Sequence, residues 1–447
     1  MKAVVIGAGM AGLVAARVLN QRGADVTVLD RDTLPVGSTP RRGVPQGAHP
    51  HVLLVSGLRE LAGLFPGFDD ELANAGGTRF DIGTGLCAYR YGRRWPREPT
   101  GLDLVSVSRP QLESLIRDRV TQLPGVTVRD GVSVTELAGD GGRVTGAVLD
   151  TGETLDADLV VDGSGRGSRS DRWLAALGFP APEQTEIKVG VAYTTRLFRR
   201  GPDDLDGWRA AVVLPTPPHE NRYGVALPIE GDRWIVGVGG WHIDAPPGDT
   251  AAFEEFAKSL PDPIVADLIA TAEPLADLVT YRFPANRRRA FDRLDRLPAG
   301  YVALGDAFCS FNPIYGQGIT VAAMAAGALG AALDRHGTAT VAMARDYHRA
   351  AADLIATPWR FAVGGDFANP KTTGPRPRGT ALSNWYARRI ALASQVAPDI
   401  NATFLSVQQL IDPASVLFRP RLVARVLWLS RPGAHRRKPA ASAARAR

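Results

Sequence analysis

KAVVIGAGMAG, residues 2–12, is an apolar run that passes directly into a glycine pattern, Gly7-x-Gly9-x-x-Gly12. An Ala-rich helical stretch follows to about Arg22, and residues 25–29 alternate as a second strand. Together these segments form a β-α-β unit of about 30 residues. In such a unit the first glycine permits a tight turn, the second lets the backbone approach a pyrophosphate, and the third allows close helix–strand packing. The stretch therefore predicts a Rossmann-like dinucleotide-binding domain.

An acidic residue, Asp30, ends the second predicted strand, where its carboxylate can accept a hydrogen bond from the ribose of an adenine dinucleotide. The helix that begins after Gly9 presents free N–H groups and the positive end of its dipole to the diphosphate. The residues of this unit that we predict to bind the nucleotide are Gly7, Gly9, Gly12, Asp30 and Arg31.

Size and composition indicate a globular protein of two to three domains, because 447 residues are 45% apolar and 22% charged. The two cysteines, Cys87 and Cys309, cannot form a disulfide framework or a dense metal-thiolate site. We therefore expect a reducing, cytoplasmic compartment and no metal. No stretch is apolar enough over about 18 residues to predict a membrane span.

The net charge of +6 is concentrated at the end of the chain. Residues 431–447 contain six Arg and Lys residues and no acid, so the remaining chain is about neutral. A nucleic-acid binder would instead carry a basic stripe across a folded face. We interpret 431–447 as a disordered basic tail and expect no nucleic-acid partner.

The pattern of elements predicts a mixed α/β and β architecture. Residues 1–180 form the first part of the dinucleotide-binding domain and 285–360 its second part, ending with a small-residue helix. Between them, residues 181–284 contain runs that alternate at period two, which is typical of an antiparallel sheet and of a substrate-covering domain. Residues 361–430 form a C-terminal helical region separated by prolines.

A second constellation identifies the dinucleotide. Gly305-Asp306-Ala307 follows a buried strand, and Phe311-Asn-Pro-Ile-Tyr-Gly-Gln-Gly318 opens a helix. Here the chain resembles the single-component flavoprotein monooxygenases of the aromatic-hydroxylase type. The resemblance implies that Asp306 binds the ribityl chain of FAD and that the turn formed by Pro313, Gly316 and Gly318 faces the flavin. Elementary physics agrees, since reduced flavin is anionic and a helix N-terminus supplies about half a positive charge.

Further positions match the same family. The resemblance implies that Arg109, before a helix, reaches the FAD phosphate, and that the backbone of Val134 meets the adenine. Arg42 lies in an R-x-G-V-P-Q loop that crosses the flavin in relatives, and Asp162 opens a segment that serves FAD and NADPH. His49 and His51 follow this loop, and we interpret both as structural.

Two departures separate this chain from the aromatic hydroxylases. The segment from Asp162 to Ser168 has a different spacing, and Phe308 replaces the usual histidine after the G-D-A turn. The chain is similar instead to actinobacterial polyether-type flavin epoxidases, which share the R-x-G-V-P-Q loop, the F-N-P-x-Y-G-x-G turn and the T-R-L-F strand of residues 195–198.

The resemblance implies a monooxygenase in which reduced FAD reacts with dioxygen to give a flavin hydroperoxide. We expect it to epoxidise or hydroxylate a lipophilic polyketide or terpenoid in secondary metabolite, including antibiotic, biosynthesis. Only one dinucleotide fingerprint is present, so the electrons come from NAD(P)H that visits transiently or from a separate flavin reductase. Because the flavin carries the chemistry, we assign no catalytic side chain. Candidate pocket residues on the predicted sheet are Tyr193, Thr195 and Trp241.

Two alternatives remain open. The first is a flavin-dependent reductase or dehydrogenase of isoprenoid double bonds, which would form product without consuming dioxygen. The second is a non-redox cyclase or isomerase, which would need only catalytic reductant. A halogenase is disfavoured, because the G-W-x-W-x-I-P signature is missing and Gly240-Trp241 continues as His-Ile-Asp.

Overall fold

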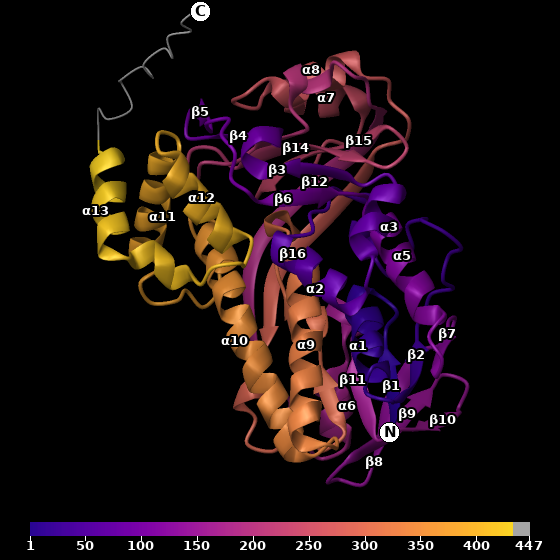
Figure 1. Cartoon of the computed structure of the whole chain (residues 1–447). Helices are drawn as coiled ribbons and strands as arrows, with labels where there is room; N and C mark the ends of the chain where they lie inside the picture. The colour runs from indigo at the N-terminus through magenta and orange to yellow at the C-terminus, as the bar shows by residue number, and fades with distance from the viewer. Residues whose placement is uncertain (432–447) are drawn as a thin grey trace, which may run out of the picture.

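A computed structural model of the chain describes residues 1–431. The tail predicted at 431–447 lies outside these residues except for Arg431. Two large sheets of different character organise the fold. Figure 1 shows a parallel sheet in the lower half of the molecule, near the N-terminus, and a mixed sheet above it.

The five-stranded sheet is built from segments far apart in sequence. Its strands run in the order β17-β11-β1-β2-β7 and all pair in parallel. The bounds are β1 (Lys2–Ile6), β2 (Asp25–Leu29), β7 (Val126–Arg129), β11 (Leu159–Asp162) and β17 (Tyr301–Ala303). The central strands are nearly continuous apolar runs, as expected when helices cover both faces of a parallel sheet. This topology confirms the Rossmann-like prediction.

Small residues let the covering helices approach closely. The Ala- and Gly-rich helix α9 (Gly318–His336) packs against α1 (Met10–Asn20), α2 (Val55–Leu64) and α10 (Val341–Asp366), and α9 and α10 lie side by side in Figure 1. On the other side of α1 lies α5 (Arg109–Thr121), which begins where the Ser108 hydroxyl accepts a hydrogen bond from the Gln111 amide at 3.2 Å.

A separate three-stranded antiparallel sheet lies beside the parallel one, where β9 contacts β11. It contains β8 (Val134–Gly139), β9 (Val144–Leu149) and β10 (Thr154–Asp156). The remaining small elements of the first 180 residues are α3 (Phe68–Asn74), β3 (Thr78–Asp81), α4 (Ile82–Gly85), β6 (Asp103–Ser106) and α6 (Ser170–Ala176).

The eight-stranded sheet runs in the order β18-β16-β12-β15-β14-β13-β4-β5. Its antiparallel centre consists of β12 (Gln184–Arg199), β14 (Arg222–Ile229), β15 (Arg233–Trp241) and β16 (Val279–Arg289). The outer strands are β13 (Ala210–Val213), β4 (Leu86–Arg90), β5 (Arg93–Arg94) and β18 (Cys309–Ser310). Helices α7 (Thr250–Lys258) and α8 (Ile264–Thr271) cover it at the top of Figure 1.

Two predicted segment boundaries differ from the elements observed. The boundary at residue 284 falls inside β16, and β4 and β5 join the sheet from the first part of the chain, because strand pairing is decided by tertiary contacts. The boundary at residue 360 falls inside α10, which continues through Pro358.

The C-terminal helices form a separate cluster, drawn in yellow at one side of Figure 1. Helices α11 (Thr380–Ser394), α12 (Pro398–Gln408) and α13 (Pro420–Leu429) share an apolar core of their own, which includes Tyr386, Ile400 and Phe404. Within residues 1–431, no helix combines the length and apolar character that a membrane span requires.

Candidate functional site

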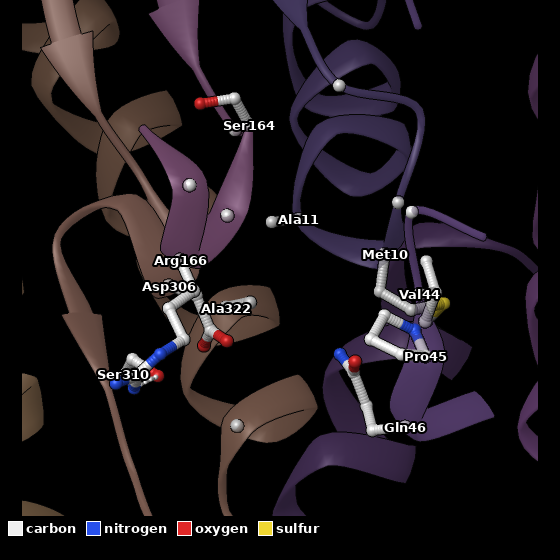
Figure 2. Close-up of a pocket in the computed structure, with 18 of the residues that line it drawn as sticks. Met10, Ala11, Val44, Pro45, Gln46, Ser164, Arg166, Asp306, Ser310 and Ala322 are labelled. Carbon is white, nitrogen blue, oxygen red and sulfur yellow. Dashed lines mark hydrogen bonds between the residues drawn. The ribbon is translucent and has the colours of Figure 1, made fainter. Parts of the chain in front are cut away.

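A cleft of about 400 Å³ lies where the carboxyl ends of the parallel strands meet the mixed sheet. This edge is where open α/β sheets bind ligands. Figure 2 shows Arg166, Asp306 and Ser310 gathered on one side of the cleft, opposite Met10, Val44, Pro45 and Gln46. The predicted residues that line it are Gly7, Gly9, Asp30, Arg31, Arg109, Val134, Tyr193, Asp306, Pro313, Gly316 and Gly318.

The glycine turn after β1 has the space that a pyrophosphate needs. A Cβ on Gly12 would lie 1.7 Å from the Gly7 carbonyl oxygen, so Gly12 serves the packing of α1 on β1 and does not line the cleft. At Gly9, by contrast, a Cβ would meet only the Arg41 guanidinium, at 3.7 Å. The backbone at Gly9 is therefore open toward the cleft, beside the amides of the first turn of α1. This geometry fits the diphosphate of FAD.

Three carboxylates converge beside this turn on one buried arginine. The Arg41 guanidinium lies 3.1 Å from Asp30, 3.1 Å from Asp32 and 2.8 Å from Glu113. Glu113 also accepts from Arg109 at 3.1 Å. Burial opposes ionisation of Glu113, but Arg109 and Arg41 together hold the pKa of its carboxyl below the usual range. The cluster thus joins the end of β2, the 41–51 loop and the first turns of α5.

The arginine of the loop that faces the cleft is Arg41. Its neighbour Arg42, which we predicted from the resemblance, is exposed and does not line the cleft. The physical reason is that the three carboxylates select one of two adjacent arginines. Asp30 already accepts hydrogen bonds from the Ala8 amide at 2.7 Å and from Arg41, so a ribose hydroxyl would share this acceptor.

The second turn presents one acidic side chain to the cleft. Burial raises the pKa of Asp306, against the opposing influence of Arg166 and Arg109, while Ser310 hydrogen-bonds its carboxyl. Gly305 has φ of +64°, which lets the chain turn out of β17 and place Asp306 beside the N-terminus of α9. This placement fits a hydroxyl-rich ribityl chain.

A buried carboxylate that the sequence did not reveal fixes the turn at 312–316. Asp366, near the end of α10, accepts hydrogen bonds from Trp241 at 2.7 Å, Asn312 at 2.9 Å, Tyr315 at 3.2 Å and Asn286 at 2.6 Å. Burial raises the pKa of Asp366 to about 6, although these four donors lower it. The residue therefore connects the turn at 312–316 with two strands of the mixed sheet.

A buried carboxylate, Asp162, supports the loop after β11. Asp162 is fully buried and does not line the cleft. Its carboxylate accepts hydrogen bonds from the Ser164 amide at 3.0 Å, Ser168 at 2.5 Å and Tyr301 at 3.1 Å. We therefore interpret Asp162 as support for this loop, which presents Arg166 to the cleft. The Arg166 guanidinium donates to the Ala285 carbonyl at 2.6 Å and lies over the Phe283 ring.

The wall contributed by the mixed sheet is mostly aromatic. Tyr193, Tyr281 and Phe283 line it, with Phe311 from the second turn. The hydroxyls of both tyrosines are without hydrogen bonds to other groups in the described part of the chain. Burial raises the pKa of Tyr193 and Tyr281, so both rings are neutral at pH 7.

Two of the three predicted pocket residues lie behind this wall. Thr195 does not line the cleft, because its hydroxyl meets Nδ1 of the buried His49 at 2.8 Å. Trp241 does not line the cleft either, and its indole N–H donates a hydrogen bond to Asp366. Burial lowers the pKa of His49 to about 4 and that of His51 to about 3, so neither is a base with a pKa near 7. His51 does line the cleft.

Comparison with known proteins shows the family of the chain. The model of the FAD binding domain family matches residues 1–362. The protein Rv3254 of Mycobacterium tuberculosis is 33% identical over 428 residues, which cover 87% of this chain and 89% of that protein. Zeaxanthin epoxidase of Spinacia oleracea is 24% identical over 332 residues, covering 71% of this chain and 45% of the epoxidase.

Among solved structures, a flavoprotein/dehydrogenase from Cytophaga hutchinsonii superposes with a TM-score of 0.68 at 18% identity, over 96% of this chain and 98% of that one. This likeness shows the fold alone. The family match, by contrast, spans the glycine turn, the Asp306 turn and all the residues that line the cleft. The chain belongs to the FAD-binding family of flavin-dependent monooxygenases.

Proposed function

We propose that this monooxygenase epoxidises or hydroxylates a lipophilic small molecule, such as a polyketide or terpenoid of secondary metabolism. The observation that carries the proposal is the wall of four neutral aromatic rings, Tyr193, Tyr281, Phe283 and Phe311, which the Arg166 guanidinium borders at Phe283. Such a wall favours an apolar substrate by burying its surface. The similarity to a protein named zeaxanthin epoxidase is consistent with an alkene as the reacting group.

When bound, FAD supplies the reduced ring that activates dioxygen. The glycine turn and Asp30 would hold its adenosine diphosphate half, while Asp306 and the turn at 312–318 would hold its flavin half. The mixed sheet and the 41–51 loop would exclude water from the reacting atoms. In the reaction one oxygen atom enters the substrate and the other leaves as water, with two electrons from NAD(P)H or from a separate reductase.

Epoxidation is the simpler chemistry for this wall. Hydroxylation of a phenol benefits from a base that deprotonates its hydroxyl group. Among the cleft-lining residues of the described chain, the carboxylates are Asp30 and Asp306, both at the positions predicted for FAD. The adjacent His51 is neutral, since burial lowers its pKa to about 3. An electron-rich alkene needs no such base.

The test supplies the FAD-loaded protein with a reductant, isotopically labelled dioxygen, and a panel of polyenes, terpenoid alkenes and phenols. One labelled oxygen atom in the product, with matching oxygen consumption, would support the proposal, and the substrate that turns over would separate epoxidation from hydroxylation. Product formed without oxygen uptake would instead indicate the reductase. An isomeric product that needs only catalytic reductant would indicate the cyclase or isomerase.

A further inference from the structure

The charge of the chain is divided sharply between two regions. Residues 367–447 contain 14 of the 52 Lys and Arg residues but only two of the 46 Asp and Glu residues, Asp399 and Asp412. Their net charge is therefore +12, whereas residues 1–366 carry −6. The region from 367 onward includes all three C-terminal helices. Neither α11 nor α13 contains an acidic residue.

The same region exposes large apolar side chains. Eleven such side chains are exposed in the described residues, and six of them lie between residues 380 and 431. Four have exposed fractions of 69% (Leu382), 62% (Phe418), 62% (Trp428) and 46% (Trp385). Isolated exposed apolar residues are ordinary on a protein surface, but a cluster marks an interaction site.

Side-chain contacts join Trp385 of α11 to the end of α13, beside Trp428. The Arg389 guanidinium lies over the Trp385 ring and donates to the Ser430 carbonyl at 2.7 Å. The next residue, Arg431, lies 3.5 Å over the Trp428 ring. We call this surface the α11–α13 face. It comprises Leu382, Trp385 and Arg389, which lie along one side of α11, Arg421 and Trp428, which lie along one side of α13, and Arg431.

We propose that the α11–α13 face docks on the surface of an anionic lipid bilayer. Tryptophan and leucine enter the interface between headgroups and acyl chains, while neighbouring arginines keep their charged ends at the phosphate level. Arg421 and Arg431 have no carboxylate partner within residues 1–431, so their charge is available to lipid phosphates. The negative charge of residues 1–366 turns the rest of the molecule away from such a surface.

Other binding partners of the α11–α13 face fit the observations less well. A symmetric contact between two copies would set this basic face against itself and bring like charges together. A nucleic acid would use the arginines but has no place for the exposed Leu382. The bilayer satisfies both the charge and the apolar surface. This inference does not depend on the proposed reaction, because docking can be measured without turnover.

The experiment is co-sedimentation of the full chain with vesicles of phosphatidylcholine alone and of phosphatidylcholine mixed with phosphatidylglycerol, at low and high salt. We expect binding to the mixed vesicles that is weakened by salt. Trp385→Ser and Trp428→Ser should each weaken the partition coefficient about tenfold. Arg421→Gln and Arg431→Gln should each weaken it about fivefold. Val36→Ser and Arg59→Gln, which change exposed residues of the acidic region, should leave it unchanged.

Three results would overturn the proposal. One is failure of the unmodified chain to sediment with the anionic vesicles. The second is sedimentation that both tryptophan variants leave unchanged. The third is loss in these variants of a dimer, or of retardation by duplex DNA, without any effect on vesicles. Retained flavin content and thermal midpoint in each variant show that the substitutions act at the surface.

Discussion

Replacement of Arg41 by methionine tests how the nucleotide end of the cleft is held together. Methionine keeps the length of the side chain but removes the guanidinium that pairs with Asp30, Asp32 and Glu113. All four side chains are at most 12% exposed. Breaking a buried pair by removing one partner costs about 3–5 kcal/mol, because charge is left uncompensated.

The lower end of that range applies here. Glu113 keeps Arg109 as a partner, and Asp30 keeps the amides of Ala8 and Asp32. We therefore expect Arg41→Met to lower the free energy of unfolding by about 3 kcal/mol at pH 8. The matched control is Arg42→Met, which removes the exposed neighbour and should change it by less than about 0.5 kcal/mol.

The difference should also depend on pH. The pKa of Glu113 is depressed in the folded protein, where burial is outweighed by Arg109 and Arg41. A depressed carboxyl pKa stabilises the fold above the unfolded pKa, and this stability is lost as the pH falls through the folded pKa. Arg41→Met lacks part of the stability that ionised Glu113 contributes. The difference in free energy of unfolding between this variant and the unmodified chain should therefore be smaller in acid than at pH 8.

Urea unfolding of the apoprotein, followed by far-ultraviolet circular dichroism, measures both differences. Equal effects of Arg41→Met and Arg42→Met would refute the assignment of Arg41 as the buried partner. A deficit that does not change between pH 8 and acid would refute the electrostatic reasoning and leave only lost packing.

Three further predictions concern the two turns. Gly12→Ala places a Cβ 1.7 Å from the Gly7 carbonyl oxygen, so it should yield little folded protein, and a normal thermal midpoint would contradict the packing role. Asp306→Ala should strip FAD, whereas stoichiometric flavin after purification would contradict the ribityl assignment. Between about pH 4 and 7, the free energy of unfolding of Asp366→Asn should rise by about 3 kcal/mol relative to that of the unmodified chain. The pKa of Asp366 in the folded protein, about 6, exceeds the unfolded value of 3.8, so the stability from this group is lost as the pH rises through 6. Urea midpoints of the two proteins that shift in parallel with pH would exclude this titration.

The parallel sheet and both turns could be predicted from sequence because their signals are local. Gly7, Gly9 and Gly12 lie within six residues, and their spacing encodes the geometry directly. The sequence could not predict whether Arg41 or Arg42 faces the cleft, because this depends on carboxylates from three separate segments. The i,i+4 spacing of Arg109 and Glu113 on a predicted helix was an available signal for this cluster.

The pocket residues show a second limit of sequence reasoning. Alternation along β12 correctly puts Tyr193 and Thr195 on one face, since side chains repeat every second residue. It does not tell which of them the 41–51 loop will cover. In the structure His49 from that loop meets Thr195, and only Tyr193 remains at the cleft.

Glu113 and Asp366 have the same physical role at opposite ends of the cleft. A buried carboxylate is costly unless every oxygen is paired, so it tolerates only one arrangement of the segments that donate to it. Glu113 fixes the 41–51 loop against α5, and Asp366 fixes the turn at 312–316 against the mixed sheet. Glu113 is not one of the residues identified from the family resemblance, and Asp366 falls beyond the matched residues 1–362. The motifs therefore supply residues that line the cleft, whereas these two carboxylates fix the loop and the turn that border it.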